Sequence, residues 1–121
     1  MKLASTKETI SGYGSQYIRT SRDNEYFVFS KITKELTAAI GDSGRFAMIE
    51  AVNANSQLWT IIITDLTHSE NNLPADVKAG LLSLAFFSLK LGRKILSDKV
   101  SADPLVEINI SIMKGLRGDM G

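Results

Sequence analysis

The chain has 121 residues and a mass of 13.2 kDa, with 14 basic and 13 acidic residues and a formal net charge of +1. This length corresponds to one domain, which can bury a hydrophobic core without disulfides or structural metal ions. The small net charge excludes binding of nucleic acid or anionic lipid through bulk charge alone. The absence of cysteine excludes disulfide scaffolds, thiolate zinc sites and thiol catalysis.

Residues 1–20 are rich in serine, threonine, glycine and tyrosine and have little apolar periodicity. They predict a loosely ordered arm ahead of a single helical domain, residues 21–121. The N-terminal sequence lacks the apolar region of a secretory signal. The most apolar stretch, residues 80–92, is too short to span a bilayer. We therefore expect a cytoplasmic protein that does not insert into membranes.

Two helices are predicted in the first half of the domain. The first starts at Ser21 or Asp23, which are good N-cap residues. Residues 41–44 form a turn in which glycine ends the first helix and serine or aspartate caps the second, at residues 45–66. The first helix carries its apolar stripe at Phe29, Ile32, Leu36 and Ile40.

Two proline positions predict two further helices. Pro74 fits the first turn of a third helix that runs to about Leu96. Asp103 and Pro104 fit the N-cap and first position of a fourth, whose apolar stripe includes Asn109 as a buried amide. The expected fold is all-α, a small bundle of about four helices.

The third helix has an unusually wide apolar surface. One stripe contains Val77, Leu81, Leu84, Leu91 and Ile95, and a second contains Leu82, Phe86, Leu89 and Leu96. The first interpretation is a central helix surrounded by the others. The alternative is a groove for a partner's amphipathic helix, located on the second stripe. Trp59 fits either the core or the rim of such a groove.

No residue pattern predicts catalysis, a cofactor or a metal ion, and we do not expect an enzyme. The single histidine, His68, lies near Asp65 and Glu70, but at a helix C-terminus it is expected to complement the helix dipole. Lys90, Arg93 and Lys94 cluster near the end of the third helix. Complementation of the helix dipole together with solvation explains them most simply, with RNA phosphates or acidic partner residues as the alternatives.

The ordered spacing of short motifs resembles the bacterial flagellar regulator family FlaF. The resemblance covers about 95 residues and includes the Ser21-Arg22-Asp23 start of the first helix. The other motifs that carry it are Leu58-Trp59, Asp65-Leu66, Asn72-Leu73-Pro74, Leu81-Leu82-Ser83-Leu84, Pro104-Leu105, Ile108-Asn109, Ile112, Gly115 and Leu116.

This resemblance implies a cytoplasmic secretion chaperone that binds flagellin and supports its synthesis and export. The terminal segments of flagellin fold as helices only in the filament, and an apolar helical groove suits such segments. The alternative is a post-transcriptional regulator of flagellin that acts through an FlbT-like partner or flagellin mRNA, although we do not expect direct nucleic-acid binding. The predicted partner-binding residues are Trp59, Leu82, Phe86, Leu89, Lys90 and Arg93.

Overall fold

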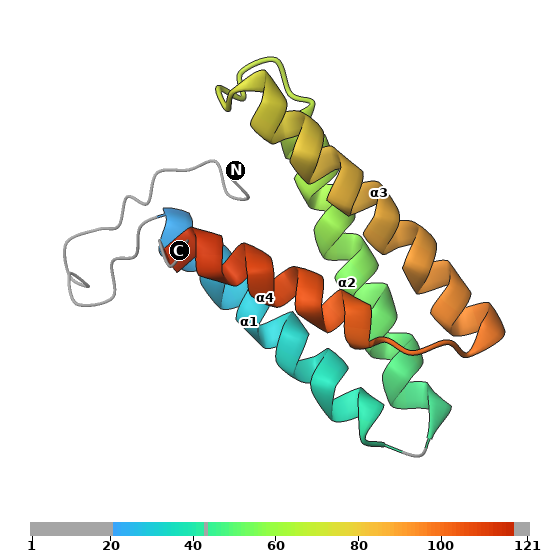
Figure 1. Cartoon of the computed structure of the whole chain (residues 1–121). Helices are drawn as coiled ribbons and strands as arrows, with labels where there is room; N and C mark the ends of the chain where they lie inside the picture. Colours follow the sequence, from blue (N-terminus) through green and yellow to red (C-terminus); the bar gives the residue numbers. More distant parts are fainter. Residues whose placement is uncertain (1–20, 43, 118–121) are drawn as a thin grey trace.

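A computed structural model describes residues 21–42 and 44–117, and the predicted arm at residues 1–20 lies outside them. The described part contains four helices and no strand, which confirms the predicted all-α fold (Figure 1). The helices are α1 (Ser21–Ile40), α2 (Arg45–Leu66), α3 (Ala75–Asp98) and α4 (Asp103–Arg117).

The helix ends differ from the prediction in three details. The N-cap of α2 is Gly44, without a side-chain capping bond, and Asp42 Oδ1 instead accepts a 2.8 Å hydrogen bond from the Gly44 N–H inside the turn. The expectation of a serine or aspartate cap is therefore wrong. Helix α3 continues past Leu96 to Asp98 and ends at Lys99, whose φ of 57° is left-handed. Helix α4 includes Asp103 as its first residue.

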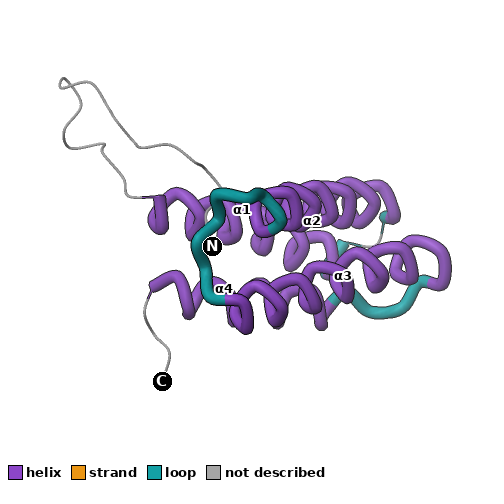
Figure 2. The backbone as a smooth tube through the Cα atoms, turned by 90° about the horizontal axis from the view of Figure 1, so that it is seen from above, coloured by secondary structure: helices purple, strands orange, loops and turns teal. Residues whose placement is uncertain are grey.

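The four helices form two antiparallel pairs. Helix α1 packs along α4, and α2 packs along α3, while α1 and α2 also contact each other. Figure 2 shows α1 and α2 in one layer and α3 and α4 in the other. The two pairs diverge from the corner that holds the α1–α2 and α3–α4 connections (Figure 1).

Helix α3 lies at the edge of this arrangement. It packs mainly on α2 and touches α4 only weakly. The interpretation of α3 as a central, surrounded helix is therefore wrong. The helix that contacts the others most evenly is α2, which packs on both α1 and α3 and bonds to α4 through side chains.

The hydrophobic core has two clusters. One lies near the connecting corner and contains Leu36, Ala39, Ala51, Val52, Ile95, Ala102 and Leu105. The other contains Phe29, Leu58, Trp59, Ile62, Leu66 and Ala85. In the second cluster the rings of Phe29 and Trp59 meet edge to face, with centroids 5.7 Å apart and planes at 74°. This geometry adds to the stabilisation from their burial.

Candidate functional site

The side of α3 that packs on α2 is made mainly of small residues. Its buried residues are Ala85, Ser88, Gly92 and Ile95. A Cβ atom on Gly92 would lie 3.1 Å from Ser56 Oγ and 3.2 Å from Val52 Cγ1, so the glycine permits a close approach of the two helices. Apart from Ile95, the large apolar residues discussed below lie on the flanks of this contact.

One of these flanks, which we name the α3 flank, contains most of the predicted site. Leu82, Phe86 and Leu89 are spaced at i, i+4 and i+7, which places them on one side of the helix. Leu82 and Leu89 are partly buried against the second core cluster, whereas the Phe86 side chain is 57% exposed. Lys90 and Arg93, which are exposed, continue this side toward the C-terminus of α3. The α3 flank is Leu82, Phe86, Leu89, Lys90 and Arg93.

The opposite flank of α3 carries a second exposed aromatic ring. Phe87 is 50% exposed, and it lies about 100° around the helix axis from Phe86. Phe46, on the first turn of α2, is 71% exposed on a different helix. These two residues resemble Phe86 in exposure but do not lie on the α3 flank.

The three cations on α3 do not complement its dipole. Lys90, Arg93 and Lys94 are exposed and form no ion pair within the described residues, and the last turn of α3 contains no basic residue. Arg45 on α2 takes this role, because its Nη2 donates to the carbonyl oxygens of Ile95 and Leu96 at 3.3 and 3.1 Å. The expected dipole complementation by the three cations is therefore wrong, although their exposure agrees with the expected solvation. The role of Arg45 was not predicted.

Trp59 belongs to the core rather than to a surface groove. Its side chain is fully buried, and its indole N–H donates a 3.2 Å hydrogen bond to Asn109 Oδ1. Asn109 Nδ2 in turn donates to Asn55 Oδ1 at 2.8 Å. Trp59 therefore cannot contact a partner in this conformation, which corrects its assignment to the partner-binding set. The prediction of Asn109 as a buried amide is confirmed.

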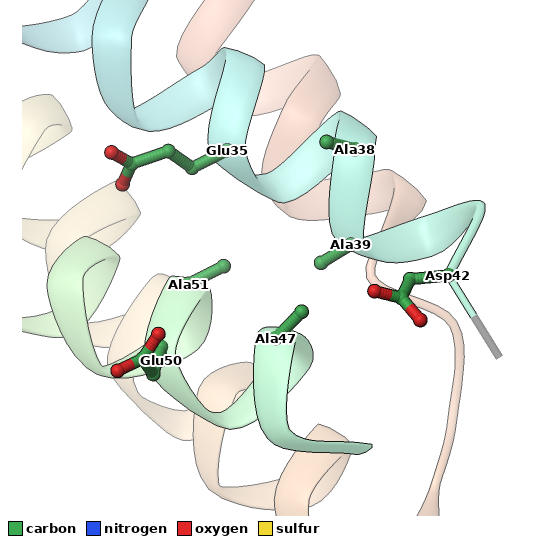
Figure 3. A pocket seen from close by; sticks show the side chains of 7 residues that line it. All are labelled: Glu35, Ala38, Ala39, Asp42, Ala47, Glu50 and Ala51. Atoms are coloured by element: carbon green, nitrogen blue, oxygen red, sulfur yellow. The ribbon is translucent and has the colours of Figure 1, made fainter. Parts of the chain in front are cut away.

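A shallow pocket of about 340 Å³ lies between α1 and α2 (Figure 3). Methyl groups of alanines line its walls, the carboxylates of Glu35 and Glu50 lie at one end, and Asp42 lies at the other. Glu35 is paired with Lys31 at 2.9 Å, and Asp42 is bonded to the turn. None of the predicted site residues lines this pocket, so it is separate from the α3 flank.

The described residues include no group of three or more side chains arranged to hold a metal ion. None of the described helices combines the length and the apolar character needed to cross a membrane. His68 is exposed, and its Nδ1 accepts a 3.0 Å hydrogen bond from the Glu70 N–H in the turn after α2. Of the predicted partner-binding residues, those that are exposed are Phe86, Lys90 and Arg93 of α3.

Comparison with known proteins gives one result. No curated protein and no solved structure matches the chain significantly. The family model described as "Flagellar protein FlaF" matches residues 13–116, which include all four helices except the last residue of α4. A match over this much of the sequence shows the family and confirms the resemblance seen in the sequence motifs. The chain belongs to the FlaF family of flagellar proteins.

Proposed function

We propose that this flagellar protein binds flagellin in the cytoplasm as a secretion chaperone and keeps the subunit unassembled until export. The observation that carries the proposal is the 57% exposure of Phe86 between the partly buried residues Leu82 and Leu89. A large apolar side chain in this setting forms a surface on which an amphipathic helix can dock. The terminal segments of flagellin, which become helical in the filament, have the required character.

The size of the surface fits transient capture rather than permanent assembly. One flank of a helix supplies a few apolar anchors, and in most interfaces a few such residues account for most of the binding free energy. A chaperone has to release its client at the export apparatus, so a short apolar flank suits this role. The described residues carry no buried charge on this flank that would have to be neutralised on binding.

The test is co-elution of the full-length chain with monomeric flagellin on a sizing column. Flagellin lacking either terminal segment is run in parallel to locate the bound segment. We expect a stoichiometric complex that is lost with one truncation and with Phe86→Asp. Phe46→Asp is the matched control, because it changes an exposed phenylalanine on another helix. Absence of a complex at micromolar concentrations would contradict the proposal.

A second candidate function is regulation of flagellin synthesis through an FlbT-like partner or flagellin mRNA. The observation that favours it is the unpaired group of Lys90, Arg93 and Lys94. Nucleic-acid binding by these cations would fall steeply with salt. Charge reversal at all three would abolish RNA binding, whereas an apolar interaction with flagellin centred on Phe86 would persist.

A further inference from the structure

Two cations on the α3 flank have no role within the described fold. Lys90 and Arg93 follow Phe86 by four and seven residues and share its side of the helix. Arg93 lies about 10 Å further along the helix axis than Phe86. Both side chains are exposed, and neither forms an ion pair or a hydrogen bond with another described residue.

The end of α3 does not require these charges. Its terminal carbonyl groups at Ile95 and Leu96 already accept hydrogen bonds from Arg45. The helix also continues five residues beyond Arg93, to Asp98, and a dipole effect is confined to the last turn. The positive charge therefore lies beside the exposed Phe86 ring without an internal cause.

The α3 flank also lacks any compensating acid. The acidic residues of α3 are Asp76 and Asp98, and both lie on the far side of the helix from Leu82 and Leu89. Asp98 follows Lys94 by four residues, so these two charges are neighbours on the helix surface. Lys90 and Arg93, in contrast, have no acid at i±3 or i±4. The flank that begins with apolar residues thus ends in two uncompensated positive charges.

We infer that the α3 flank is a binding site for an acidic amphipathic helix of a partner protein. The apolar stripe of that helix packs on Leu82, Phe86 and Leu89. Its aspartate or glutamate residues lie about two turns from the residue that meets Phe86, where they face Lys90 and Arg93. The charges set the direction and register of the bound helix and accelerate its association. Only the identification of this partner as flagellin rests on the proposed function.

The test uses designed peptides and the full-length chain, so that it does not depend on flagellin. Each peptide is an 18-residue amphipathic helix with a leucine stripe, and three glutamates or three lysines occupy one terminal turn. Peptides with the charged turn at either end cover both binding directions. In fluorescence anisotropy at 50 mM NaCl we expect one glutamate peptide to bind roughly tenfold or more tightly than its lysine counterpart. Phe86→Asp abolishes binding of both.

Variants of the chain assign the preference to specific cations. Lys90→Glu combined with Arg93→Glu is expected to reverse the preference toward the lysine peptide. Lys94→Glu is the matched control, because Lys94 is an exposed cation of α3 that lies about 80° around the helix axis from Phe86, further from the ring than Lys90 or Arg93. With Lys94→Glu, the logarithm of the affinity ratio between the glutamate and lysine peptides should keep at least half of its original value. Since these side chains are exposed, all variants should retain the helical circular dichroism signal.

Several results would overturn the inference. One is equal affinity for the glutamate and lysine peptides. Another is no binding of any peptide at protein concentrations up to about 100 μM. A third is a change of preference by Lys94→Glu as large as that by Lys90→Glu combined with Arg93→Glu. Binding of a single-stranded RNA that all three charge reversals abolish, without peptide binding, would identify the cations as a nucleic-acid surface instead. Flagellin co-elution is scored separately. A flagellin complex without charge preference removes this inference alone, and a charge preference without a flagellin complex removes the proposed function alone.

Discussion

Asn109 on α4 and Asn55 on α2 are joined by a hydrogen bond of 2.8 Å between their buried side-chain amides. The same Asn109 side chain accepts a hydrogen bond from Trp59. The network links two helices through the core, and the Asn55 Nδ2 group has no acceptor among the described residues. Because every group in such a network has lost its contact with water, removal of one member is costly.

We predict that Asn109→Leu lowers the free energy of unfolding by about 2–4 kcal/mol. The substitution leaves both the Trp59 indole N–H and the Asn55 carbonyl buried without a partner, at about 1–3 kcal/mol for each group. Urea denaturation followed by circular dichroism measures the change. In a double-mutant cycle, Asn55→Leu together with Asn109→Leu should cost less than the sum of the single changes. Strict additivity would show that the two amides do not interact.

A pair of glycines on α3 predicts opposite effects of the same substitution. Gly80→Ala should stabilise the protein by about 0.5–1 kcal/mol, because an added Cβ meets nothing within 4 Å and alanine favours the helix. Gly92→Ala should destabilise it by about 1 kcal/mol, since the new methyl group presses on Val52 and Ser56. Thermal and urea unfolding of the two variants provide the comparison. Equal stabilisation by both would mean that α2 and α3 are not in close contact at Gly92.

Much of this fold is readable from the sequence because helical periodicity and helix-ending residues are local signals. The apolar stripe at Phe29 and Leu36 identifies the buried side of α1, and both residues are fully buried. The boundaries of α2 at Arg45 and Leu66 follow from the glycine turn and the end of the stripe. Asn109 is identifiable as a buried amide because it interrupts an apolar stripe.

The arrangement of α3 is not readable in the same way. Its packed side consists of Ala85, Ser88 and Gly92, whose small size matters only in relation to Val52 and Ser56 on the facing helix. A search for large apolar side chains therefore finds the flanks and, within the contact, only Ile95. The signal that could have identified it is the i, i+3, i+7 spacing of these small residues.

Non-local hydrogen bonds are the second source of error in the candidate site. Arg45 is 50 residues away from Ile95 in sequence, so its bond to the end of α3 cannot be inferred from α3 itself. Without it, the three cations of α3 are the natural candidates for the helix dipole. The sequence around Trp59 is likewise the same whether its ring enters the core or borders a groove. Its core position depends on a non-local partner, Asn109, which accepts the hydrogen bond of the indole N–H.

Arg45→Met is predicted to lower the free energy of unfolding by about 1–2 kcal/mol. The variant keeps most of the apolar stem but leaves the carbonyl groups of Ile95 and Leu96 without this donor. Lys94→Met is the control, because Lys94 is exposed and forms no ion pair with a described residue. Its effect should stay within about 0.5 kcal/mol. A larger loss of unfolding free energy in Lys94→Met than in Arg45→Met would show that the cations of α3, and not Arg45, stabilise the helix end.

Phe86→Asp and Trp59→Ala are predicted to differ in stability by several kcal/mol although both remove an aromatic ring. Trp59 is fully buried and bonded, so its truncation should cost about 3–5 kcal/mol. Phe86 is 57% exposed, so Phe86→Asp should cost about 1 kcal/mol or less, part of which is the lower helix propensity of aspartate. Urea titrations with a common unfolding slope allow the two values to be compared.

This difference in stability decides how a loss of binding is interpreted. If Phe86→Asp retains its unfolding midpoint and helical signal, failure to bind flagellin must come from the altered surface of α3. If it unfolds as readily as Trp59→Ala, Phe86 is a core residue and the α3 flank is not an open surface. Phe87→Asp offers an internal comparison, because Phe87 is similarly exposed on the opposite flank. It should match Phe86→Asp in stability and retain binding, since only the ring of Phe86 lies between Leu82 and Leu89.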